Sequence, residues 1–88
     1  MFKFVREGKK YLVQFPNEEI RELLPSEIDS FYERVNKVIE ALGLKNQYIE
    51  SKEQKDTSLI DFAIEMDIDL DACLYAVLSH FRLEKINN

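Results

Sequence analysis

The stretch from Asp69 to Phe81, which reads DLDACLYAVLSHF, carries the densest run of apolar residues in this chain. These residues recur at steps of three and four, so a helix would gather most of them into one stripe along its side. The members of this apolar stripe are Leu70, Cys73, Leu74, Val77, Leu78 and Phe81. Such a helix must be covered by the other segments or by a second chain. We therefore expect it at the centre of the core, and a homodimer through residues 69–83 is a further option.

The length of the chain predicts one small domain, residues 1–88, with a single core. Hydrophobic residues make up 45% of the sequence, which is enough for that core. Cys73 is the single cysteine, so no disulfide can form within the chain, and its place on the stripe indicates a packed thiol in a reducing compartment. No apolar run approaches the roughly 20 residues that span a bilayer. We expect a soluble, cytoplasmic protein without a membrane partner.

The first fifteen residues predict a β-hairpin, because apolar and polar residues alternate in two runs on either side of Glu7 and Gly8. With these two residues as the loop, Phe4 would face Tyr11, and an aromatic face would result. An isolated hairpin is marginally stable in water, so this face must pack on the helices or the strands must gain a third partner. Residues 47–50 are the only candidate for a third strand.

Helix signals divide the rest of the chain. Asn17 can cap a short helix, which Pro25 would end. A longer helix is predicted from Pro25, or the residue after it, through Leu42, where Gly43 offers the left-handed residue that closes a helix. Residues 45–55 are polar and of mixed charge, which indicates a connector.

A further short helix is predicted over residues 59–66, after a capping segment at 56–58, and it leads directly into the apolar helix. Two runs of alternating residues followed by helical patterns are typical of the α+β class. The sequence therefore predicts an N-terminal β-hairpin packed on a small bundle of three to four helices.

The sequence Asp67-Ile-Asp69-Leu-Asp71 opens like the calcium loop of an EF-hand. That loop needs glycine at its sixth position and glutamate at its twelfth, but this chain has Ala72 and Leu78 there. We therefore do not expect a calcium site, and we interpret these acids as caps at the start of the apolar helix.

Residues for catalysis are scarce. His80 is the only histidine, and seven helical residues would separate it from Cys73 by roughly 10 Å, too far for the two to share a metal. Asp61 and Glu65 stand one helical turn apart, which is ordinary for acids on a solvated helix. The two glycines of the chain form no phosphate-binding loop. We expect a protein that is not an enzyme and that holds no metal and no cofactor.

The helix pair within residues 58–81 has the layout of a helix-turn-helix. A recognition helix, however, presents basic or amide side chains to DNA, whereas this one would begin with Asp69 and Asp71. We do not expect nucleic acid as the partner of this pair. The alternative is a small dimeric DNA-binding transcriptional regulator that brings a basic hairpin to the duplex.

The charge distribution is the feature most informative about function. Residues 1–15 carry four bases and one acid, yet the whole chain has a net charge of −5. One stretch has six acids and no base: Asp56, Asp61, Glu65, Asp67, Asp69 and Asp71. Such a surface can simply keep a protein soluble, or it can steer it to a basic partner. Our leading hypothesis is a non-enzymatic regulator, similar to an inhibitor or an antitoxin, whose acidic face docks on a basic protein. The predicted contact residues are Asp61, Glu65, Asp67, Asp69 and Asp71.

Overall fold

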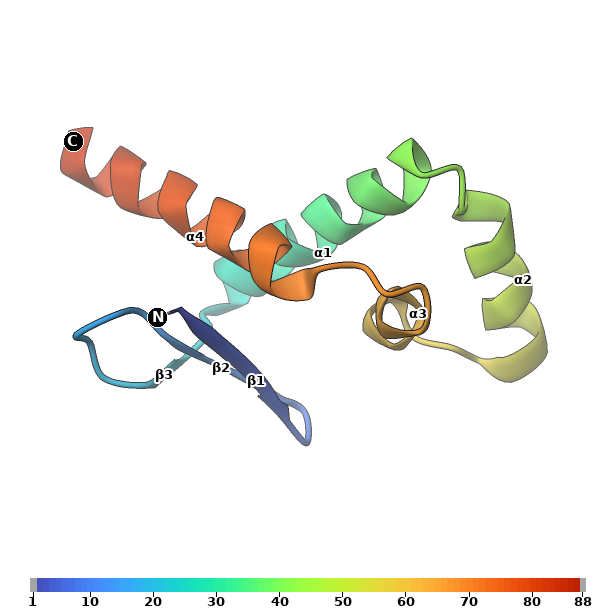
Figure 1. Cartoon of the computed structure of the whole chain (residues 1–88), viewed down its shortest axis with the longest axis horizontal. Helices are drawn as coiled ribbons and strands as arrows, with labels where there is room; N and C mark the ends of the chain where they lie inside the picture. Colours follow the sequence, from blue (N-terminus) through green and yellow to red (C-terminus); the bar gives the residue numbers. More distant parts are fainter. Residues whose placement is uncertain (1, 88) are drawn as a thin grey trace.

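The computed structural model describes the backbone from Phe2 to Asn87 and the side chains from Phe2 to Arg82. A small antiparallel sheet comes first in the chain, and helices follow it (Figure 1). The strands are β1 (Lys3–Glu7), β2 (Lys10–Gln14) and β3 (Arg21–Glu22), and the helices are α1 (Pro25–Ala41), α2 (Lys45–Lys55), α3 (Leu59–Glu65) and α4 (Leu70–Asn87). The predicted α+β class, with an N-terminal hairpin packed on helices, is confirmed.

The hairpin forms, but its predicted register was wrong by two residues. Phe4 pairs with Val13 and Arg6 pairs with Tyr11, so the loop consists of Gly8 and the residue after it. Gly8 stands at the first loop position with a φ of 63°, a left-handed conformation that glycine adopts at no steric cost. Because side chains alternate with period two, a shift of two residues leaves every side chain on its predicted face. The aromatic face is therefore present although its partners are exchanged.

The third strand of the sheet is β3, and it overturns two predictions. The short helix expected from Asn17 does not form, because Asn17 has a φ of 63° and takes part in a turn that brings the chain back beside β2. The Leu23 N–H group then donates to the Tyr11 carbonyl at 2.9 Å, and the Leu23 side chain is buried in the core. Residues 47–50, the expected third strand, lie instead within helix α2.

Helix α1 begins at Pro25 as predicted and ends at Ala41, one residue before the predicted end, with Leu42 as its C-cap and Gly43 after it. Gly43 has a φ of 72°, its N–H group donates to the Glu40 carbonyl, and the Leu44 N–H group donates to the Ile39 carbonyl. These two bonds form the Schellman arrangement, which satisfies carbonyl groups that the last helical turn leaves free.

Helix α2 occupies the segment that we expected to be a connector. Its sequence is polar almost throughout, but it contains no glycine or proline and is rich in lysine, glutamine and glutamate, which favour helices. One aromatic side chain attaches it to the core, since the Tyr48 ring lies 5.2 Å from the ring of Phe62. The polar composition of this segment therefore led to the wrong prediction of a connector. A short helix at the surface can be held on the core by one aromatic side chain.

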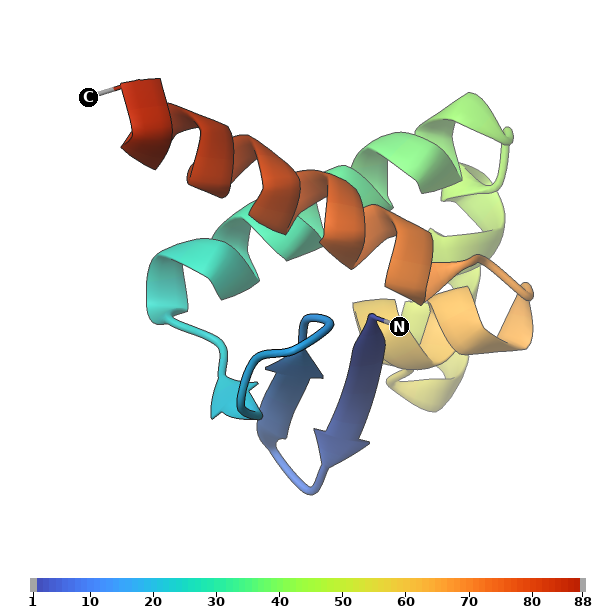
Figure 2. The same ribbon diagram turned by 60° about the vertical axis from the view of Figure 1, so that its left-hand side comes forward.

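The core lies where α1 and α4 cross, with the sheet against one side of the crossing (Figure 2). Cys73, Leu74 and Leu78 of the apolar stripe are buried where α4 packs on α1, and Leu74 is 0% exposed, whereas Val77 and Phe81 are half-buried. Phe31 of α1 is also fully buried, and its ring contacts the rings of Phe4 and Tyr11 in the sheet. Burial, and then the hydrogen bond to Tyr32, raises the pKa of Tyr11 to about 12, so its phenol stays protonated in the core.

A buried carboxylate ties the sheet to the start of α1. Glu27 accepts two hydrogen bonds from the Arg21 guanidinium, at 2.8 and 2.9 Å, and one from the Leu24 N–H group at 2.8 Å. Burial raises the pKa of Glu27, but the bonds from Arg21 and from Leu24 outweigh it, and the pKa is lowered below its ordinary value of 4.5. The ionised form is thus the one that the fold favours.

We predict that Leu74→Ala lowers the free energy of unfolding by about 2 to 5 kcal/mol, because it leaves a cavity at the helix crossing. Leu42→Ala is the matched control: this leucine is 59% exposed, and its loss should change the free energy by less than about 0.5 kcal/mol. Urea denaturation of the three proteins measures both values. Equal losses in the two variants would place Leu74 outside the core.

We predict that the stabilising effect of Glu27 depends on pH. Since folding lowers its pKa below 4.5, the ionised carboxylate contributes stability above that pH and loses the contribution as pH falls through the folded pKa. Wild type should therefore exceed Glu27→Gln in stability at neutral pH, and the difference should shrink below pH 4.5. Urea denaturation of both proteins across this pH range measures the difference in their free energies of unfolding. The other carboxylates contribute equally to both proteins, so their effect cancels in that difference. A difference that does not vary with pH would contradict the prediction.

Candidate functional site

The five acids predicted to contact a partner lie on α3 and at the start of α4, and all five are exposed. Asp61 and Glu65 stand on α3, Asp67 lies in the turn, and Asp69 and Asp71 lie at the beginning of α4. This end of the molecule lies away from β3 (Figure 1). The structure therefore gathers them in one region, but it gives them different local roles.

Asp61 is held by the hairpin. The Arg6 guanidinium of β1 donates to the Asp61 carboxylate at 2.8 Å, across 55 residues of sequence. The hydrogen bond from Arg6, and then the one with Ser58, holds the pKa of Asp61 below its ordinary value. This carboxylate already has a cationic partner within the chain, so it is less available to a second protein than the sequence indicated.

Asp69 caps helix α4, as expected for acids at that position. Its Oδ1 atom accepts the Ala72 N–H group at 3.0 Å, which satisfies one of the free donors of the first turn. Asp67 closes the preceding helix: its φ is 60°, and the next N–H group, that of Ile68, donates to the Ala63 carbonyl. The backbone of Asp67 thus shapes the turn, while its side chain points to solvent.

The remaining charges are free. In the part of the chain whose side chains are described, the carboxylates of Glu65, Asp67 and Asp71 take part in no ion pair and no hydrogen bond. Two apolar side chains lie among them, since Ile64 is 55% exposed and Met66 is 37% exposed. We name these five residues the acidic turn surface. It presents apolar groups surrounded by unpaired carboxylates.

The sequence prediction did not include Ile64 and Met66 in the site, because it assigned them to the apolar residues of the short helix. For Ile64, the helical spacing nevertheless indicates an exposed side chain. In a helix of seven residues, Ile60 and Ala63 lie on the buried arc with their apolar neighbours, whereas Ile64 falls on the arc of Asp61 and Glu65. The helical spacing of acids around Ile64 therefore indicates exposure.

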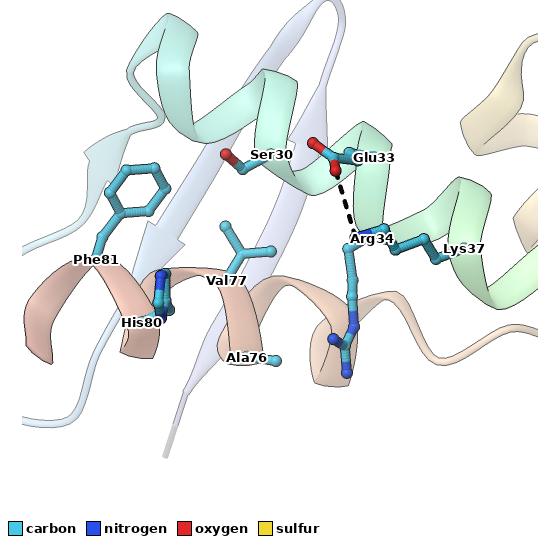
Figure 3. Close-up of a pocket in the computed structure, with 8 residues that line it drawn as sticks. All are labelled: Ser30, Glu33, Arg34, Lys37, Ala76, Val77, His80 and Phe81. Carbon is cyan, nitrogen blue, oxygen red and sulfur yellow. Dashed lines mark ion pairs between the residues drawn. The ribbon is translucent and has the colours of Figure 1, made fainter. Parts of the chain in front are cut away.

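A second surface is a groove between Ser30–Lys37 of α1 and Ala76–Phe81 of α4, with a volume of about 640 Å³ (Figure 3). We name it the α1–α4 groove. It lies on the side of the helix crossing that faces away from the sheet, because Tyr75 and Arg82 are the α4 residues that contact Phe15. His80, the only histidine, lines this groove.

A third surface is an apolar depression of about 190 Å³ on the outer face of the sheet. Val5, Leu12 and Ile20 contribute its apolar lining, and we name it the outer sheet patch. Among the described residues, no three of His, Cys, Asp or Glu lie together so that they could hold a metal ion. Within the same residues, no helix is both long and apolar enough to cross a membrane.

The helix-turn-helix layout of α3 and α4 is present, but two arginines that could approach a duplex are engaged within the chain. Arg6 is bound by Asp61, and Arg82 pairs with Glu18 at 2.9 Å while its guanidinium lies 4.4 Å from the centre of the Phe15 ring. The hairpin cations that have no ion pair among the described residues are lysines, at positions 3, 9 and 10, and all three are exposed.

Comparison of the chain with protein-family models, with curated proteins and with solved structures found no match. The function of these surfaces is therefore argued from their chemistry.

We predict that Asp69→Ala destabilises the protein by about 1 kcal/mol, because it removes the cap of α4. Glu65→Ala should change the free energy of unfolding by less than about 0.5 kcal/mol, since its carboxylate contacts nothing within the described residues. Thermal unfolding of both variants tests the distinction between a structural and a free acid. Similar losses would show that Asp69 is no more structural than Glu65.

Proposed function

We propose that this protein is a non-enzymatic regulator that binds a basic protein through its acidic turn surface, as an inhibitor or an antitoxin does. The observation that carries the proposal is the exposure of Ile64 and Met66 beside three carboxylates that have no partner among the side chains described. Buried apolar anchors supply most of the free energy of protein association, and the surrounding charges select the partner. A surface with both features fits a basic protein that has an apolar pocket.

The pattern of pairing supports a contact rather than a purely solvated surface. Three carboxylates bind arginines within the chain, those of Glu18, Glu27 and Asp61, whereas those of the acidic turn surface have no such partner among the described residues. The acidic turn surface is a region where exposed apolar side chains occur together with carboxylates that have no partner among the described residues. The single thiol, Cys73, is buried, which supports a cytoplasmic location for the proposed regulator.

A dimeric DNA-binding regulator is the alternative function. The exposed lysines of the hairpin, Lys3, Lys9 and Lys10, favour it, because phosphate contacts are made by such side chains. A duplex would then meet the hairpin, while the acids at the start of α4 would have to stay away from it. The solution mass of the protein tests the homodimer expected through residues 69–83.

We predict that removal of the free charges abolishes capture of the partner. The variant is Glu65→Gln/Asp67→Asn/Asp71→Asn, which keeps the Asp61 pair and the Asp69 cap intact, and asparagine tolerates the left-handed conformation of position 67. Tagged proteins would be used as baits in nuclease-treated lysate of the source cell, with bound proteins identified by mass spectrometry. Wild type should retain one stoichiometric basic protein, and the variant should lose it.

The matched control is Glu19→Gln/Glu22→Gln/Asp29→Asn, which removes the same charge from exposed positions elsewhere. It should retain the partner.

With the partner purified, Ile64→Ala should weaken binding by at least about tenfold, as expected for an apolar anchor. If both triple variants lose the partner equally, the interaction depends only on the net charge of the protein. A DNA mobility shift that disappears as salt rises would instead support the hairpin alternative.

A further inference from the structure

Three of the four arginines in the chain bind a carboxylate of another segment. Arg6 binds Asp61, Arg21 binds Glu27, and Arg82 binds Glu18. Arg34 is the exception: within the described residues its guanidinium has no ion pair and no hydrogen bond. In a chain with a net charge of −5, an arginine without an acid partner is a notable site for an external anion.

Arg34 belongs to the α1–α4 groove. Figure 3 shows its side chain extending from α1 toward α4, with Phe81 toward the opposite end of the groove and Val77 between them. Burial raises the pKa of the Cys73 thiol of α4, and the Arg34 charge opposes that rise, so the guanidinium lies close to α4. The cation thus marks one end of the groove.

The groove reverses the charge of the surrounding surface. Lys37 and Arg34 stand on its α1 side, and Glu33 is its only acidic lining residue. The Glu33 carboxylate is already paired with the Lys37 ammonium group at 3.4 Å. The negative charge that an incoming anion would meet is therefore partly neutralised, whereas the Arg34 charge is not.

The α4 side of the groove contributes apolar side chains that are half-buried, beside the polar Ser30 and the exposed His80. Val77 and Phe81 offer an aliphatic and an aromatic surface that extends from Arg34 toward the other end of the groove. The volume of about 640 Å³ falls in the range of sites for small organic ligands, about 300 to 1,000 Å³. The groove therefore combines a cation that has no acid partner among the described residues with two apolar side chains in a space of suitable size.

We propose that the α1–α4 groove binds a small organic anion with an apolar body, with its carboxylate, sulfonate or phosphate group on Arg34 and its body against Val77 and Phe81. A guanidinium binds such oxyanions through two parallel hydrogen bonds, which gives this end of the groove its selectivity. The site is separate from the acidic turn surface, so the proposal does not depend on the regulator function.

The test uses two fluorescent probes that differ by one charge. 8-Anilinonaphthalene-1-sulfonate carries the anion and the aromatic body, and N-phenyl-1-naphthylamine carries the body alone. We expect the sulfonate to bind the intact protein with one-to-one stoichiometry and more tightly than the neutral probe. Two-dimensional NMR should show shifted amide signals at residues 33–37 and 76–81.

Arg34→Gln should weaken binding of the sulfonate by about tenfold, the value of one charge-assisted contact, and leave the neutral probe unchanged. Lys52→Gln, which removes an equal charge from the exposed face of α2, should change neither probe. Ala76→Phe should block both probes, because it fills the groove from a half-buried position. Thermal unfolding confirms that each variant is folded.

Four results would overturn the proposal. Equal affinity for the two probes would show that the sulfonate group does not contribute to binding. If Lys52→Gln and Arg34→Gln weaken binding equally, the probe is held only by the general charge of the protein and not by Arg34. Amide shifts at Val5, Leu12 and Ile20 would place the probe on the outer sheet patch. An acidic peptide that displaces the sulfonate while small carboxylates do not would identify the occupant as a protein segment, and the small-anion proposal would be wrong.

Discussion

The burial of Phe31 is the constraint on which the other elements depend. Its ring meets the aromatic face of the hairpin, with ring centres 5.6 Å from Phe4 and 6.2 Å from Tyr11, and it belongs to the same buried cluster as Leu74 and Leu78 of α4. The first strands of the chain and its last helix therefore share one core. Cys73, Leu74 and Leu78 of the apolar stripe are buried in it, whereas Val77 and Phe81 stay half-buried at the groove.

Arginines then fix the elements that surround this core. Arg6 links β1 to α3, Arg21 links β3 to the start of α1, and Arg82 links α4 to the turn after β2. Except for that of Glu27, these carboxylates lie at the surface, where an ion pair contributes little free energy, so their role is to fix the relative positions of the elements. The acids of the chain thus include some that hold the structure and some whose carboxylates have no partner among the described residues, as Asp61 and Glu65 on α3 illustrate.

The sequence predicts the parts of the fold that periodicity and capping determine, and it fails where tertiary contacts decide. The bounds of α1 follow from Pro25 and Gly43, and the stripe of α4 follows from its spacing. By contrast, β3 forms because burial of Leu23 outweighs a local preference for helix, and α2 forms because Tyr48 attaches a polar segment to Phe62. The acids of the candidate site could be found by composition, but the engagement of Asp61 by Arg6 could not, because 55 residues separate them.

The two proposed surfaces share α4 but should act independently. The helix begins beside the acidic turn surface and lines the groove at Ala76–Phe81, so any coupling between them would have to pass along it. Leu74 and Leu78 lie on that path and are 0% and 1% exposed, locked against α1. A shift of α4 would expose or overpack these side chains, and close-packed cores resist such small displacements. A ligand that fills the groove beside the crossing, without entering it, therefore has no low-energy way to move the turn. Charge is the remaining route, and the Arg34 cation, once neutralised by an anion, would change the field around the acids without moving them.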